Sequence, residues 1–156
     1  LGVKLHRAID AFTDQHPKMA ELRAQFPLEL RRYSGILIDL SFDHYLSKHW
    51  HNYSTLPLDA FNATIYRNLE SHKHHLGPGA RRMLLRMQQH DLLSVYGQWD
   101  SIAATAARIG DRFQRENPFL QVAQHLDPVR PQLELSFLNF YPDLIEFCGL
   151  KKHQWN

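Results

Sequence analysis

Two aspartates spaced four residues apart are the most informative pair in this sequence. Asp39 and Asp43 interrupt the run 36–46, which is otherwise mostly apolar. If the run is a helix, residues four apart share one face, so both carboxylates belong to a largely buried surface. Buried carboxylates are costly unless a partner compensates their charge. A bound cation is one such partner, and an arginine such as Arg7 or Arg32 paired with Asp39 is the alternative.

A histidine follows the second aspartate directly. A carboxylate oxygen beside an imidazole suits Mn, Fe or Zn better than Ca. Neighbouring helical residues point about 100° apart, so at most one of Asp43 and His44 faces a given metal ion. Histidine-aspartate metallohydrolases carry the order His-Asp, whereas this chain has Asp-His, so the dipeptide does not match that signature.

A second pair with the same spacing occurs near the start of the chain. His6 and Asp10 are four residues apart, and Thr13 and Asp14 extend the same helical side. A carboxylate beside an imidazole holds its tautomer or shares a metal ion with it. An ordinary surface hydrogen bond is the alternative for this pair taken alone.

Arginines are clustered rather than spread. The clusters are Arg31-Arg32 and Arg81-Arg82 with Arg86. Each is suited to a phosphate or an acidic partner, and a solvated helix face is the alternative. The net charge of +2 is too small for a general nucleic-acid binder.

Helices must position all of these residues. Apolar spacing with a helical period predicts helices over 3–15, 18–32 with a break at Pro27, 34–49, 57–72, 80–98, 100–113 and 128–153. In the last helix we expect Pro131 in the first turn and a kink or interruption at Pro142. No alternating strand pattern occurs. We therefore predict one all-α domain over 1–156, a bundle of about six or seven helices.

The ends of the chain and its single cysteine indicate the cellular compartment of the protein and the extent of the sequence. No apolar run is long enough to span a membrane, and no leader opens the chain. Cys148 lies in an apolar stretch, so we expect a buried free thiol and a cytoplasmic protein. The chain starts at Leu1 without a methionine or a capping residue, so we expect that an N-terminal piece is missing.

Two longer motifs resemble a known family. They are HRAIDAFTDQHP at 6–17 and IDLSFDHYLSKHW at 38–50, in that order and with suitable separation. Together they resemble the acyl carrier protein phosphodiesterases over about the first 50 residues. The later Phe-Tyr-Pro at 140–142 is also similar to that family.

This resemblance implies a reaction and a partner. The family hydrolyses the phosphodiester that joins 4'-phosphopantetheine to a serine of holo-acyl carrier protein, an acidic helical protein. The resemblance also implies an all-helical fold, divergent from the histidine-aspartate metallohydrolases, and a divalent metal, Mn or Fe rather than Zn or Mg. Full-length members carry Phe-Leu-Ala-His and Leu-Ala-Asp-Phe segments that this chain lacks. Further metal ligands are therefore expected upstream of Leu1.

Roles for individual residues follow as hypotheses. We expect His6 and Asp43 to bind the metal, Asp10 to orient His6, Asp39 to belong to the site and His44 to protonate the departing serine oxygen. Phosphodiester binding is assigned to Arg7, Arg31 and Arg32, and partner binding to Arg81, Arg82 and Arg86. The alternatives are a related phosphohydrolase of a small phosphate ester or nucleotide, and a non-catalytic helical interaction module. The sequence leaves the oligomeric state open.

Overall fold

The computed structural model describes residues 2–114 and 116–155, with the backbone alone for Leu92. The α-helices in this part are α1 (Gly2–Gln15), α2 (Pro17–Gln25), α3 (Leu28–Arg31), α4 (Ser34–Lys48), α5 (Leu58–Ser71), α6 (Pro78–Gln89), α7 (Leu92–Val95), α8 (Asp100–Gly110) and α9 (Val122–Trp155). Short 3-10 turns are η1 (Trp50–Asn52), η2 (Lys73–His75) and η3 (Pro118–Gln121). The described residues form no strand, which confirms the all-α prediction.

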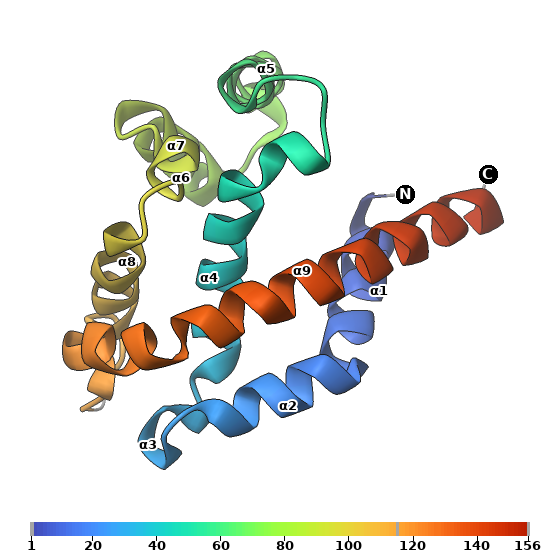
Figure 1. Ribbon diagram of the computed structural model, residues 1–156. Helices are drawn as coiled ribbons and strands as arrows, with labels where there is room; N and C mark the ends of the chain where they lie inside the picture. The colour runs from blue at the N-terminus through green and yellow to red at the C-terminus, as the bar shows by residue number, and fades with distance from the viewer. Residues whose placement is uncertain (1, 115, 156) are drawn as a thin grey trace.

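The last helix is longer than the sequence predicted. It begins at Val122 rather than near 128 and contains Pro128, Pro131 and Pro142 within its 34 residues. The predicted start near 128, with Pro131 in the first turn, was therefore wrong, and of the kink or interruption expected at Pro142 the continuous helix excludes the interruption (Figure 1). Within the described residues, no helix has the combination of length and apolarity that crossing a membrane requires.

The predicted helix over 80–98 is divided in two. α6 ends at Gln89 and α7 begins at Leu92, with Asp91 between them in the left-handed region at φ 42°. Aspartate tolerates this conformation better than most residues, because its short polar side chain bonds locally. Periodicity alone did not reveal this reversal, since apolar residues continue on both sides of it.

A core of large side chains joins α2, α4, α8 and α9. Phe26 of α2's end, Tyr45 of α4, Ile102 of α8 and Phe137 of α9 are all essentially inaccessible to solvent. The Tyr45 hydroxyl, buried with its ring, donates to the backbone oxygen of Arg130 at 2.9 Å. This bond fixes α4 against α9, the two helices that later form opposite walls of the candidate site.

The corner between α1 and α2 holds α1 against α9. His16 accepts a hydrogen bond from the Lys18 backbone N–H through Nδ1 and lies 3.3 Å from Asp143 Oδ2 through Nε2. Further along α1, the ring of Phe12 stacks on Phe147 with centroids 4.4 Å apart. Both contacts set the position of the polar face of α1 relative to α9.

The three helices α5, α6 and α7 form a lobe at one side of the molecule, away from α9 (Figure 1). Their mutual packing includes Tyr66, whose hydroxyl donates to the Met87 oxygen at 3.1 Å and accepts from the Leu93 N–H at 3.2 Å. Trp50 of η1 contacts Phe61 of α5 at 4.7 Å between centroids. The lobe is thereby tied to the end of α4.

Candidate functional site

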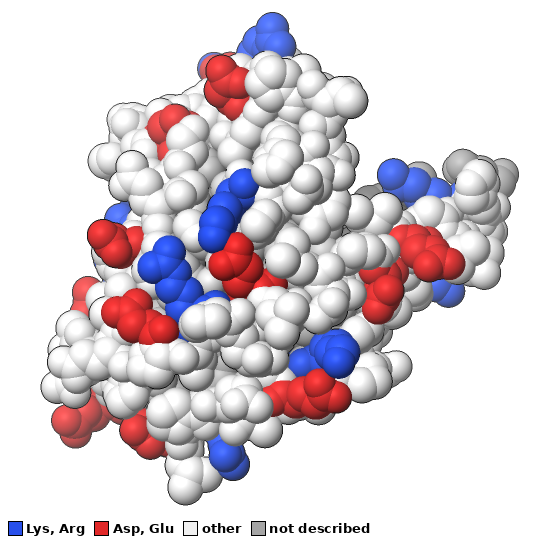
Figure 2. Space-filling model, in the orientation of Figure 1, with Lys and Arg blue, Asp and Glu red and all other residues white. Residues whose placement is uncertain are grey.

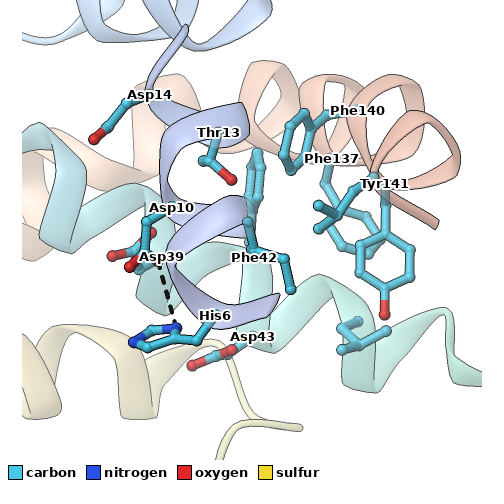
Figure 3. A pocket seen from close by; sticks show the side chains of 13 residues that line it. His6, Asp10, Thr13, Asp14, Asp39, Phe42, Asp43, Phe137, Phe140 and Tyr141 are labelled. Carbon is cyan, nitrogen blue, oxygen red and sulfur yellow. Dashed lines mark ion pairs between the residues drawn. The ribbon is translucent and has the colours of Figure 1, made fainter. Parts of the chain in front are cut away.

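A cavity of about 580 Å³ lies between α1, α4 and α9 (Figure 3). Its volume falls within the range of roughly 300–1,000 Å³ that is usual for small-molecule sites. Its lining divides into a polar wall from α1 and α4 and an apolar wall mainly from α9. The lining residues are His6, Ile9, Asp10, Thr13, Asp14, Asp39, Phe42, Asp43, Leu46, Phe137, Phe140, Tyr141 and Leu144.

The polar wall combines the two pairs that the sequence singled out. His6 and Asp10 come from α1, and Asp39 and Asp43 come from α4. Spacing of four residues places each pair on one helical face, and both faces line the same cavity (Figure 3). Helical periodicity therefore predicted the members of this wall, although it did not predict that the two helices meet.

The carboxylates on α4 are open to solvent from the cavity rather than enclosed in the core. This differs from the expected buried pair, because α4 turns Leu37 and Tyr45 into the core and leaves the aspartates on another side. Within the described residues, neither Arg7 nor Arg32 forms an ion pair with Asp39. The alternative of a simple arginine partner thus finds no support in the geometry.

Protein atoms around the cavity nevertheless alter the acidity of these carboxyls. Partial burial, and then the negative charge of Asp39, raise the pKa of Asp43 to about 6. Burial also raises the pKa of Asp39, with Asp14 and Asp10 adding to the shift and Arg23 opposing it. Negative charge is therefore concentrated here beyond what the neighbouring cations balance, which favours a cation or a proton at Asp43.

His6 and Asp10 lie at the edge of the cavity. His6 Nδ1 is 3.6 Å from Asp10 Oδ1, as the dashed line in Figure 3 marks. Both side chains are more than half exposed, so this contact is too weak to matter for stability. Its significance is positional, because it keeps an imidazole beside the carboxylates of α4.

The apolar wall was not anticipated from the sequence. Phe137 and Phe140 of α9 contact the Phe42 ring at 5.5 and 5.8 Å between centroids, and Tyr141 stacks on Phe137 at 5.0 Å. Burial raises the pKa of Tyr141, so its hydroxyl stays protonated and is able to donate a hydrogen bond. The spacing of aromatic and aliphatic residues at 137, 140, 141 and 144 was the available signal.

His44 is absent from the residues that line this cavity. Its ring is 4% exposed and packs against Tyr45 and Trp99. Nδ1 lies 2.9 Å from the Tyr96 carbonyl oxygen, which can only accept, so Nδ1 carries the proton. Burial lowers the pKa of His44. The structure therefore supports a packing role that ties α4 to the segment before α8, and it does not bring His44 to the site as a general acid.

The lowered pKa of His44 predicts a pH effect on stability. Unfolding restores the ordinary value near 6.5, so the unfolded chain takes up a proton there before the folded chain does. Stability from this group is thus complete above pH 6.5 and is lost as the pH falls below it. Between pH 7.5 and 5.0, wild type should therefore lose more unfolding free energy than His44→Asn. Urea unfolding of both proteins at the two pH values tests this, and equal losses would contradict it.

The arginines expected to bind phosphodiester lie outside the lining of the cavity. Arg31 donates to the backbone oxygens of Phe26 and Ala24 at 3.1 and 3.3 Å, which stabilises the end of α2. Arg32 lies over the Tyr33 ring, with its guanidinium carbon 4.5 Å from the centroid. Arg7 is exposed on α1. The structure thus does not bring these three arginines together with the carboxylates.

The fit of a divalent metal is partial. The carboxylates of the polar wall and His6 have the oxygen and nitrogen atoms that Mn or Fe prefers, and their mutual repulsion favours a cation. In residues 2–114 and 116–155, however, no three His, Cys, Asp or Glu side chains are arranged closely enough to hold an ion. The described residues therefore supply charge and some ligands without a complete ligand set.

Comparison with known proteins identifies relatives along almost the whole chain. A family model described as acyl carrier protein phosphodiesterase matches residues 1–144, which include both walls of the cavity. The acyl carrier protein phosphodiesterase of Klebsiella pneumoniae (strain 342) is 30% identical over 156 residues, covering 97% of this chain and 79% of the relative. That of Escherichia coli O45:K1 is 29% identical, covering 96% and 78%. No solved structure matches the chain.

Proposed function

This chain belongs to the acyl carrier protein phosphodiesterase family, and on that basis we propose how its cavity carries out the reaction. The reaction hydrolyses the phosphodiester between 4'-phosphopantetheine and a serine of holo-acyl carrier protein. Its products are the apo protein and free 4'-phosphopantetheine. The single observation that supports this site is a cavity with an acidic wall facing an aromatic wall, inside the matched region.

The two walls fit two parts of this substrate. The phosphopantetheine arm is an uncharged chain of methylene and amide groups ending in a charged phosphodiester. We place the uncharged arm along Phe42, Phe137 and Tyr141, where its apolar groups leave water. The Tyr141 hydroxyl is a donor for an amide or phosphate oxygen. The phosphodiester then lies toward Asp39 and Asp43, the groups with raised pKa values.

The carboxylates of the polar wall repel a phosphodiester unless their charge is offset. We propose that a divalent ion, Mn or Fe, is held by Asp43 and His6, with Asp10 orienting His6 and Asp39 adding negative charge. When bound, such an ion supplies charge neutralisation and a more acidic water molecule. Ligands before Leu1 and a kinship with the histidine-aspartate metallohydrolases stay predictions.

One assay tests this function against its alternatives. Purified protein is incubated with holo-acyl carrier protein, with and without Mn²⁺ and with a chelator, and loss of the arm is followed by intact mass. We expect release of 4'-phosphopantetheine that the chelator stops and Mn²⁺ restores. Turnover of nucleotides or small phosphate esters alone would support a related phosphohydrolase. Binding of the carrier protein without turnover under any condition would support an interaction module.

The acidic partner requires a basic contact surface. Figure 2 shows that Lys and Arg are interspersed with Asp and Glu on one face, which therefore presents no broad basic field. α6 is different, because it carries three arginines and no acidic residue. Arg81 donates to the backbone oxygens of Leu76 and His74 at 2.7 and 3.3 Å, so it anchors the preceding turn.

The other two arginines of α6 are free to meet a partner. Arg82 and Arg86 are exposed, share a face by their spacing, and form no ion pair within the described residues. Met83 and Leu85 beside them are 52% and 55% exposed, which adds apolar contact area. We propose that this face of α6 docks the acidic carrier protein.

Charge reversal on α6 should therefore weaken recognition without altering the chemistry. For Arg82→Glu/Arg86→Glu we expect about a tenfold higher KM for holo-carrier protein at low salt, with kcat unchanged within about twofold. Added salt should shrink the difference, because it screens the attraction. Steady-state kinetics measure both values, with exposed Lys18→Glu as control. An unchanged KM, or an equal rise in the control, would exclude α6 as the docking surface.

The single cysteine bears on cellular location. Cys148 is free and partly buried, and burial raises the pKa of its thiol. A thiol with a raised pKa reacts slowly, which fits a structural residue in a reducing compartment. The free thiol of Cys148 is the observation that supports a cytoplasmic location, which we therefore keep as a proposal.

A further inference from the structure

A second cavity, of about 560 Å³, lies where the start of α4 meets the chain that follows α8. Arg32, Tyr33, Arg112, Phe113 and Gln114 line it, and none of them lines the first cavity. We call it the Arg32–Arg112 cavity. Arg32 was expected to bind the phosphodiester, so its presence here leaves a guanidinium that the proposed reaction does not use.

No carboxylate of residues 2–114 and 116–155 forms an ion pair with the two arginines of this cavity. Arg32 contacts the hydroxyl and ring of Tyr33, and across the described chain neither Arg32 nor Arg112 forms an ion pair with a carboxylate. Two guanidinium groups that share one concave surface without a counter-charge suit a dianion. A phosphate monoester has the matching charge and oxygen geometry, because guanidinium binds such oxygens in pairs.

Aromatic rings supply the rest of the surface. Phe113 is 38% exposed, and its ring stacks on Tyr33 with centroids 5.6 Å apart and planes 22° apart. Beneath them the ring of Phe119 is fully buried and contacts Tyr33 at 5.0 Å and Phe113 at 5.8 Å between centroids. This support keeps Phe113 in place with part of its ring open to solvent. An exposed, well-supported ring beside arginines is suited to stacking a flat heterocycle.

We infer that the Arg32–Arg112 cavity binds a phosphorylated ligand with a flat aromatic ring, of the class of nucleoside phosphates. Arg32 and Arg112 bind the phosphate, the exposed part of Phe113 stacks on the base, and Gln114 offers amide groups to the base edge or sugar. The inference is independent of the proposed hydrolase function, because it rests on residues outside the first cavity.

Calorimetric titration with adenosine 5'-monophosphate tests this inference directly. We expect binding with a Kd below about 1 mM, and at least tenfold weaker binding of adenosine alone and of inorganic phosphate alone. Equal affinity for the nucleotide and for phosphate would overturn the stacking role of Phe113. Absence of nucleotide binding, or binding of acidic carrier protein here in its place, would overturn the inference as a whole.

Variants distinguish nucleotide binding in the Arg32–Arg112 cavity from non-specific attraction to positively charged residues. Arg32→Gln and Arg112→Gln should each weaken nucleotide binding at least tenfold, and Phe113→Leu at least threefold. Arg108→Gln is the matched control, since Arg108 lies on α8 four residues before Arg112, does not line this cavity and donates to Thr105 of its own helix. It should change affinity less than twofold. If Arg112→Gln does not fold, Arg112→Lys takes its place, because lysine keeps the positive charge but cannot form two parallel bonds to a phosphate. An unchanged nucleotide affinity in Arg112→Lys would contradict paired bonding by the guanidinium.

Discussion

Asp43→Asn should lower the turnover of holo-acyl carrier protein by at least about a thousandfold while the protein stays folded. The variant removes one negative charge from the polar wall and keeps the shape of the side chain. Since the pKa of Asp43 is raised to about 6, it is the carboxyl of this cavity best suited to hold a cation or exchange a proton near neutral pH. Single-turnover kinetics followed by intact mass, with the enzyme in excess over holo-acyl carrier protein, measure the effect.

Two controls make the Asp43→Asn result specific. Asp111→Asn, an exposed carboxylate just after α8, should retain full turnover. In metal-free buffer Asp43→Asn should also be more stable than wild type above pH 6, by about 1 kcal/mol after allowance for solvent screening. The sign follows from the raised pKa, because wild type loses stability as the pH rises from 3.8 toward 6. A variant with more than a tenth of wild-type turnover would rule out the proposed role.

Gly110→Ala should destabilise the fold by about 3 kcal/mol, which corresponds to a fall in Tm of roughly 10 °C for a chain of this size. A β-carbon at Gly110 would lie 2.5 Å from Asn117 Oδ1 and 2.7 Å from the Phe119 β-carbon. These atoms have little freedom to move, because Phe119 is fully buried and Asn117 Nδ2 donates to the Gly110 oxygen at 2.9 Å. Thermal and urea unfolding measure the loss.

The chain contains its own control for this substitution. Gly149 lies within α9, and a β-carbon there would meet no described atom within 4 Å beyond its chain neighbours and the backbone of its own helix. Gly149→Ala should therefore be neutral or stabilise the helix by up to about 1 kcal/mol. Equal effects of the two substitutions would mean that helix propensity, rather than close packing of α8 against η3, decides the outcome at Gly110.

Local periodicity predicted the helices of the N-terminal half well and the last helix poorly. α1 follows the pattern of one apolar helical face, and α4 follows its nearly continuous apolar run, which is buried on several sides. α9 contains three prolines, and each removes a backbone donor, so the sequence indicated a later start and a break. Tertiary packing overrides that local cost, since Leu133, Phe137 and Phe140 bury against the other helices.

One wall of the candidate site was predictable from local sequence spacing, and the other was not. The polar wall was predictable because His6 with Asp10, and Asp39 with Asp43, are neighbours on single helices. The apolar wall depends on where α9 crosses α1 and α4, which no local pattern encodes. His44 illustrates the converse: it is adjacent to Asp43 in sequence, yet the helical rotation of one residue turns it into the core.

The dependence of the cavity on α9 has a consequence for the order in which the protein matures. His16 of the α1–α2 corner and Asp143 of α9 are 127 residues apart in sequence, so the contact that positions α1 against α9 joins distant parts of the chain. During synthesis from the N-terminus, α1 and α4 leave the ribosome before α9. Phe12 and Phe42, which contact aromatic rings of α9 in the folded protein, are then still exposed. A nascent chain that ends before α9 therefore carries the polar wall of the cavity and lacks most of the apolar wall. We therefore expect the cavity to form only after α9 has been synthesised, and the apolar side chains of α1 and α4 that α9 covers to stay exposed until then.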